Sequence, residues 1–273
     1  MMDQLDQARG NVAERLKAQP TPGVGARGFT IVEVLVVVAV IAVLIGILLP
    51  ALSAARERAI MIQCAARQQQ VGTAIHNYAN HNKNSIPYGP EGLPASFTNL
   101  YPRKGIVTNL ISLQNAQPVG LGLLLKVYLA DTPEALFCPG SDQPVDVAGE
   151  LAKVGVSQAQ GSYFYRHGSG SSLAADTDTT HTKLDRLGKN RNGKKIRALA
   201  MDTQMLVHPS YAPFGIVTRT HHRFQEVNVL FDDGHVEASS NAGNRYTVEI
   251  TSNPYAGLDQ ILLALEKADE LVE

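Results

Sequence analysis

The sequence predicts an α+β protein with one long N-terminal helix, and three features of the chain support this class. From Val34 to Leu49 no side chain is polar or charged. The apolar residues that follow recur at helical three- and four-residue steps. Further along, short segments rich in apolar and aromatic residues are separated by turn residues, which is typical of strands.

The composition excludes several classes of protein. The chain has 273 residues, of which 44% are hydrophobic and 18% charged, so it is too apolar and too weakly charged for a disordered protein. A net charge of -1 gives no excess of positive charge to attract phosphates, so we expect no nucleic-acid partner. A mean hydropathy of -0.06 argues against several membrane spans. One or two compact domains remain.

The apolar run has three possible interpretations. With residues 29–33 before it and Pro50 after it, the segment has about 22 residues and a helical length of ~30 Å, enough to cross a bilayer. A buried core helix is a poor fit because the segment is apolar on every side. A secretory signal peptide, cleaved near residues 53–55, has a shorter apolar region. A transmembrane helix fits best, and Arg27 before it favours a cytoplasmic N-terminus.

Residues 27–33 read RGFTIVE, and with the apolar run they resemble the type IV prepilin cleavage and methylation motif. The resemblance implies that a prepilin peptidase cuts between Gly28 and Phe29 and methylates the new N-terminus. Glu33 then becomes the fifth mature residue, an assembly residue that pairs with the α-amino group of a neighbouring subunit. Pro50 takes the position of a helix-kinking proline. Val32 departs from the isoleucine that is commoner in the family.

The resemblance also implies a pilin-like fold, in which the long helix packs on a small antiparallel sheet. We expect a cytoplasmic leader at 1–28 that is removed, a stem helix at 29–82 with its transmembrane span at 29–50, and an exported globular domain at 83–273. The implied function is that of a structural subunit of a type IV pilus or a type II secretion pseudopilus. Its partners would be prepilin peptidase, other pilin or pseudopilin subunits, the inner-membrane assembly machinery and the lipid bilayer. The protein would cross the inner membrane once, with its C-terminal domain periplasmic or extracellular.

The globular part is predicted to contain short elements and long loops. Residues 86–120 are expected to be mostly loop, and 168–194 a long exposed loop whose basic residues face solvent. Asp233 and Gly234 favour a tight hairpin turn. Short helices are expected at 121–129 and 258–271, and strands at 161–166, 196–201, 214–218, 227–231, 235–238 and 246–251.

Two cysteines, Cys64 and Cys138, are the only ones in the chain. In an exported domain they can form a disulfide between the stem helix and the sheet region, or remain two buried or free thiols. Their spacing excludes a CxxC or zinc-knuckle motif. The sequence leaves the choice between disulfide and thiols open.

A histidine-rich stretch between residues 221 and 235 is the main candidate for a metal site, with His221, His222, Asp233 and His235. It lacks the spacing of a known metal motif, and adjacent histidines on a strand point to opposite faces. The stretch also resembles the H-x9-DG group of pilin-like exported proteins, through His222, Asp233 and Gly234. Ten residues, not nine, separate His222 from Asp233 here.

Enzyme motifs are missing from the sequence. No serine lies in G-x-S-x-G, and the glycines of residues 23–28 precede a membrane helix instead of following a strand. We therefore expect no catalytic residue, no cofactor and no metal. The alternative hypothesis is a membrane-anchored exported metal-binding or enzymatic domain that uses His221, His222, Asp233 and His235.

Overall fold

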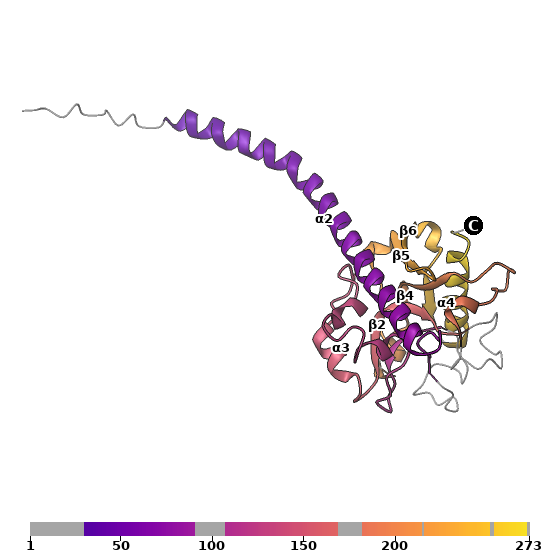
Figure 1. Ribbon diagram of the computed structural model, residues 1–273. Coiled ribbons are helices and arrows are strands. Elements are labelled where there is room, and N and C mark those ends of the chain that lie inside the picture. The colour runs from indigo at the N-terminus through magenta and orange to yellow at the C-terminus, as the bar shows by residue number, and fades with distance from the viewer. Residues whose placement is uncertain (1–29, 91–106, 169–181, 215, 252–253, 272–273) are drawn as a thin grey trace, which may run out of the picture. The chain divides into compact units, whose positions relative to one another are not determined.

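The computed structural model describes residues 30–90, 107–168, 182–214, 216–251 and 254–271. Its longest element is α2 (Ile31–His81), a continuous helix of 51 residues with Pro50 inside it. The chain divides into two compact units between Leu52 and Ser53, and α2 contributes to both. The elements are labelled in Figure 1.

The first half of α2 exposes apolar side chains on every side. Residues 31–52 are all exposed, including Leu44 at 54% and Leu48 at 63%. The helix is long and apolar enough to cross a membrane. Because a water-exposed apolar surface of this extent is unfavourable, lipid or other protein must cover it.

The second unit is built on a five-stranded antiparallel sheet with the order β1-β2-β3-β5-β6. Its strands are β1 (Val107–Ser112), β2 (Ala159–Arg166), β3 (Ala198–Asp202), β5 (Glu226–Phe231) and β6 (Val236–Ser240). A separate parallel pair joins β4 (Met205–Val207) to β7 (Val248–Ile250). The predicted α+β class, with a long N-terminal helix and an antiparallel sheet, is confirmed.

One face of the sheet is covered by the second half of α2. Its buried positions follow helical spacing, so they form a single stripe along the helix. Val71 and Ile75 in this stripe share a hydrophobic core with Tyr163, Tyr165 and other residues of the sheet. Figure 1 shows this part of α2 running beside β2.

The other face of the sheet is covered by α4 (Pro254–Ala268). Phe164 lies between Tyr163 and Tyr165 on β2 and therefore points to this side, where it joins Ile261 and Leu265 in a second core. The sheet is thus buried on both faces. This explains why β2 and β3 are buried along their whole length instead of alternating between buried and exposed positions.

Several local expectations were wrong. The region 86–120 contains β1, which sequence patterning misses because its buried positions include the polar Thr108, Asn109 and Ser112. Residues 214–218 form no strand among the described positions, since a 3-10 helix occupies Pro209–Phe214. The segment 121–129, expected to be a short helix, begins with the 3-10 helix Gly120–Leu124, and α3 (Val147–Lys153) was not expected.

The described end of the basic loop also differs from the expectation. Leu187 and Asn190 are buried. Arg191 forms ion pairs with Asp259 and Glu266 of α4, both at 2.8 Å. This part of the loop is therefore attached to the terminal helix.

A buried ion pair connects the end of the chain to the sheet. Arg166 Nη1 lies 3.0 Å from both carboxylate oxygens of Asp269, and neither side chain is exposed. The Asp269 carboxylate also accepts hydrogen bonds from the backbone amides of Arg197 and Ala198 and from the Asn190 side chain. This network fixes the residues after α4 against β2 and β3.

Substitution Asp269→Asn is expected to lower the free energy of unfolding by ~3–5 kcal/mol, because it leaves a buried guanidinium without its counter-charge. Glu270→Gln is the control, since Glu270 pairs with Arg245 at the surface and should contribute at most ~1 kcal/mol. Urea denaturation of the detergent-solubilised protein, followed by circular dichroism, measures both. Equal losses from the two variants would contradict the structural role of the buried pair.

Stability is also expected to depend on pH through His167, which is fully buried after β2. Burial lowers the pKa of His167 to about 3, although a hydrogen bond involving the Val107 backbone opposes the shift. The unfolded chain binds a proton at this residue below a pKa of ~6.5, whereas the folded chain does not until about pH 3. Stability from the neutral ring is therefore present above pH ~6.5 and decreases as the pH falls towards 3.

The change that tests this is His167→Gln, which should flatten the pH dependence of the unfolding free energy by ~1.4 kcal/mol per pH unit between pH 6 and 4. The exposed His208 provides a control for the exchange of side chain, because a surface substitution such as His208→Gln should change the unfolding free energy by at most ~0.5 kcal/mol. Urea titrations at several pH values give the slopes. A His167→Gln slope identical to that of the wild type would show that the ring does not titrate as described.

Candidate functional site

The N-terminal end of α2 is closed by a capping box between Thr30 and Glu33. Glu33 Oε2 accepts hydrogen bonds from the Thr30 backbone amide and from its hydroxyl group, both at 2.8 Å. The Thr30 hydroxyl oxygen accepts in turn from the Glu33 amide at 3.2 Å. This reciprocal arrangement satisfies backbone donors that the first helical turn leaves free.

The capping box is a role of Glu33 that the sequence interpretation missed, although the T-x-x-E spacing could have revealed it. Both hydrogen bonds from Thr30 reach Oε2. Among the described residues, Oε1 has no hydrogen-bond partner. Gly28 and Phe29, the predicted processing residues, lie outside the described part of the chain. Pro50 lies within α2, which continues through it.

Cys64 and Cys138 are brought together, with their Cα atoms 5.1 Å apart and their sulfur atoms joined as a disulfide in the structure. Cys64 belongs to the buried stripe of α2, and Cys138 follows the 3-10 helix Pro133–Leu136. The Cys138 sulfur accepts a hydrogen bond from the Gly140 amide at 3.3 Å. Whether the two cysteines pair covalently in the protein stays a prediction.

Asp202, at the end of β3, is a fully buried carboxylate beside these cysteines. Its Oδ1 lies 3.1 Å from Cys64 Sγ and accepts a hydrogen bond from the Gln68 side chain at 3.0 Å. Its Oδ2 accepts from the Asn228 backbone amide at 2.8 Å and from the Asn228 side chain at 3.1 Å. The carboxylate is therefore held in one orientation by groups from α2 and β5. The sequence interpretation did not identify Asp202 because nothing around it forms a motif.

Next to Asp202, the Tyr163 hydroxyl group lies 4.0 Å from Cys64 Sγ. Burial, together with the negative charge of Asp202, raises the pKa of Tyr163 well above its ordinary value. Tyr163 is therefore a neutral neighbour of the cysteines at physiological pH.

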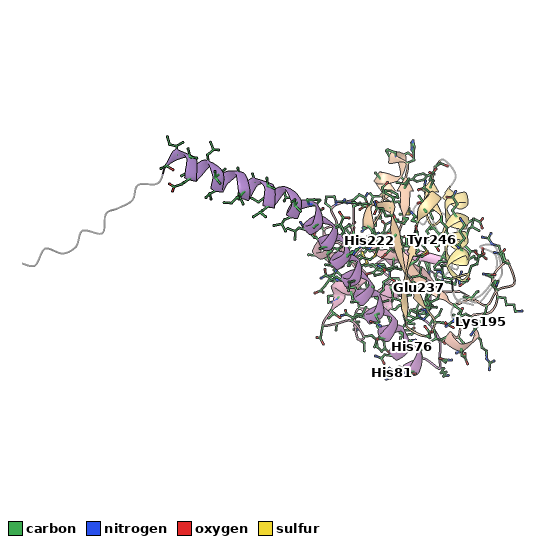
Figure 2. The ribbon with its side chains drawn as sticks, turned by 90° about the horizontal axis from the view of Figure 1, so that it is seen from above. His76, His81, Lys195, His222, Glu237 and Tyr246 are labelled. Carbon is green, nitrogen blue, oxygen red and sulfur yellow. A yellow bond between two sulfur atoms is a disulfide. The ribbon has the colours of Figure 1, made fainter. Side chains whose placement is uncertain are left out.

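His222 completes this group from a turn before β5. Its Nε2 lies 3.2 Å from Cys138 Sγ and 3.4 Å from Asp202 Oδ2. The turn has an uncommon backbone, because His222, Arg223 and Phe224 all have positive φ angles of 54°, 53° and 61°. A left-handed conformation costs roughly 1–2 kcal/mol per non-glycine residue, so three in succession are strained. Figure 2 shows His222 beside α2.

His221 has a separate, structural environment. Its Nδ1 lies 2.8 Å from the Thr203 carbonyl oxygen, and the Gln204 side chain donates a hydrogen bond to its backbone carbonyl. Burial lowers the pKa of His221 despite the opposing charge of Asp202. The ring is therefore a neutral component of the core.

The hairpin between β5 and β6 contains the other members of the histidine-rich stretch. Gly234 has a φ of +87°, as the predicted tight turn requires. Asp233 pairs with the His235 ring and, at 2.8 Å, with Arg197. Burial tends to raise the pKa of Asp233, but hydrogen bonds and charge from His235 and the charge of Arg197 outweigh it and lower the pKa.

The alternative hypothesis needs His221, His222, Asp233 and His235 to lie together, and the fold does not bring them together. Gly234 of the hairpin faces the ring of His76 on α2, whereas His222 is grouped with Cys64. Along the axis of α2, Cys64 lies ~18 Å from His76. Within the described ranges, the group of potential ligands that includes His222 consists of Cys64, Cys138, Asp202 and His222. The strand β5 separates His222 from the hairpin because it is extended.

A groove of 640 Å³ opens beside His222. It is lined by residues 53–62 of α2, by the segment after Cys138 and by the turn that carries His222. An ion pair of 2.6 Å between Arg223 and Glu57 lies at its wall. Small solutes can reach the His222 side chain through this groove.

Comparison with known families identifies the N-terminal segment. Residues 25–49 match the family model described as the prokaryotic N-terminal methylation motif. This segment is prepilin-like. The match covers the predicted processing residues, Glu33 and the whole apolar run from Val34 to Leu49, but not Pro50. No curated protein and no solved structure matches the chain.

This motif and the exposed apolar helix indicate a membrane-anchored protein, and α2 is the one helix in the described ranges that is long and apolar enough to span a membrane. They suggest a structural subunit rather than an enzyme, and a protein that is processed by a peptidase and assembles with other pilin-like subunits. The likeness of His222, Asp233 and Gly234 to the H-x9-DG group stays a resemblance, since the matched residues end at 49.

Proposed function

We propose that this prepilin-like chain is a structural subunit of a type IV pilus or a type II secretion pseudopilus. In this proposal, prepilin peptidase removes residues 1–28 and methylates Phe29, and the mature protein stays in the inner membrane until assembly. The observation that carries the proposal is the methylation motif at residues 25–49, which includes the first part of an apolar helix exposed on every side. In the membrane lipid covers that surface, and in a filament neighbouring helices replace the lipid.

Cleavage before Phe29 supplies a charge that the unprocessed chain lacks. The new α-amino group lies one residue before Thr30, at the end of the helix where Glu33 is located. A carboxylate in a low-dielectric region is costly without a counter-charge, and two hydrogen bonds to Oε2 do not neutralise it. The N-terminal cation of a neighbouring subunit can reach Oε1 and neutralise Glu33. Methylation leaves the amine protonatable, so the pairing persists after processing.

The orientation proposed for the protein follows from its charge distribution. Arg27 immediately precedes the apolar segment and favours a cytoplasmic N-terminus. The unit from Ser53 to Glu273 is then on the periplasmic or extracellular side. Its proposed partners are prepilin peptidase, which acts at the cytoplasmic end of the apolar segment, and the assembly machinery of the inner membrane.

Mass spectrometry of the protein purified from membranes tests the processing directly. The expected N-terminal peptide begins with N-methylated Phe29 and lacks residues 1–28. An intact Met1, or an N-terminus near Ala55 as a signal peptide would give, would contradict the proposal. Substitution Gly28→Ala serves as the processing control, because it changes the residue that the peptidase must recognise at the cut.

The charge of Glu33 can be separated from its capping role by two matched variants. Glu33→Gln keeps a side-chain oxygen for the capping box but removes the charge, so it is expected to insert in the membrane and fail to assemble. Thr30→Val removes the hydroxyl group but keeps the carboxylate, so it should assemble, with the start of the helix destabilised by ~1 kcal/mol. Cross-linking in membranes and sedimentation of sheared filaments measure assembly. If Glu33→Gln assembles as well as the wild type, Glu33 is a helix cap and not an assembly residue.

A further inference from the structure

We propose that Cys64, Cys138, Asp202 and His222 bind one divalent metal ion of the zinc type when the two cysteines are thiols. Each residue presents one ligand atom, and the four atoms lie within 4.8 Å of one another. The sequence predicted no metal here, and the histidine-rich stretch contributes only His222. The proposal goes beyond the role as a subunit and does not depend on filament assembly.

The ligand types are those that zinc prefers. Two thiolates, one imidazole and one carboxylate give four ligands for a tetrahedral ion. With metal–ligand bonds of ~2.0–2.3 Å, adjacent ligand atoms in a tetrahedron lie about 3.3–3.8 Å apart. The distances of 3.1 Å from Cys64 Sγ to Asp202 Oδ1, 3.2 Å from Cys138 Sγ to His222 Nε2 and 3.4 Å from His222 Nε2 to Asp202 Oδ2 are close to this range. The two sulfur atoms are joined in the structure, so a metal requires them to separate to this range in the reduced protein. Asp202 can bind the ion through one oxygen only, because Oδ1 faces Cys64 and Oδ2 faces His222.

The surroundings hold the ligands as those of a metal site do. Gln68 and the backbone and side chain of Asn228 orient the Asp202 carboxylate. The Gly140 amide donates to the Cys138 sulfur, and such a hydrogen bond stabilises a thiolate more than a neutral sulfur. Outer hydrogen bonds of this kind orient ligands and tune metal affinity.

The strained turn at His222 provides an independent reason for a ligand. Three consecutive left-handed residues are unfavourable by themselves, and here they direct Nε2 of His222 towards Cys138 and Asp202. The Arg223 amide donates to Asp142 and the His222 amide to the Gly140 carbonyl, and a bond from His222 to a metal would add to these contacts in offsetting the strain. The groove beside His222 supplies the access route to a cluster whose other members are buried.

Metal binding and a disulfide are alternative states of the same sulfur atoms. Binding converts two thiols into two metal–sulfur bonds and releases two protons, and a disulfide offers no thiolate for this. Either state connects α2 to the sheet region. The metal would also bind β3 through Asp202 and the turn before β5 through His222.

The experiment uses the full-length protein in detergent, reduced with a phosphine, freed of metal and titrated with Zn²⁺ or Co²⁺. The wild type should bind one equivalent per chain. Its Co²⁺ form should show the absorption of a tetrahedral site together with a thiolate-to-cobalt charge-transfer band. His222→Ala should weaken binding at least tenfold. His235→Ala, which changes an exposed histidine of the hairpin, should bind like the wild type.

A second measurement keeps the proposal testable if His222→Ala folds poorly. Zn²⁺ should slow alkylation of Cys64 and Cys138 by iodoacetamide at least tenfold in the reduced wild-type protein. Absence of stoichiometric metal in the reduced, folded wild type, or unchanged affinity in a folded His222→Ala variant, would overturn the metal site. Neither result would affect the N-terminal mass spectrum, so failure here is distinguishable from failure of the proposed subunit function.

Discussion

The burial of one stripe of α2 against the sheet is the interaction on which the domain depends. Val71, Ile75 and their neighbours fill the core on one side of β2, β3 and β5. The same helix begins as a segment apolar on every side, so one continuous element serves two environments. An all-round apolar surface suits lipid or a bundle of helices, whereas a stripe suits a sheet. The change in pattern therefore marks the beginning of the compact unit near Ser53.

Polar residues interrupt this buried stripe in one place. Gln68 and Cys64 face Asp202 and Asn228 there. The Asp202 carboxylate is fully buried, which is unfavourable unless hydrogen bonds or a cation stabilise the charge. An apolar core of the same volume would avoid that cost. The concentration of polar groups at this point, beside a strained turn and a groove, is the physical basis for assigning the cluster a binding role. The Arg166–Asp269 pair on the opposite face is different, because its charges already neutralise each other.

Sequence patterning predicted the parts of the fold that follow a simple period. The striped half of α2, the hairpin turn at Gly234 and most positions of β2, β3 and β5 were expected from spacing and turn chemistry. It missed β1, whose polar residues are buried by contacts with distant segments. It also grouped His222 with Asp233 and His235, although the extended strand β5 holds them apart. The T-x-x-E capping box was readable and was overlooked.

The sequence by itself determined the membrane-anchored, prepilin-like character of the N-terminal segment. That information is local, because a processing motif, one carboxylate and an apolar run lie within a few helical turns. Their spacing in the sequence therefore determines their relative positions along the helix. Only the tertiary structure decided that Cys64, Cys138, Asp202 and His222 meet at one point. These residues are far apart along the chain and share no period. Their proximity results from the packing of α2 on an antiparallel sheet, which local spacing does not encode.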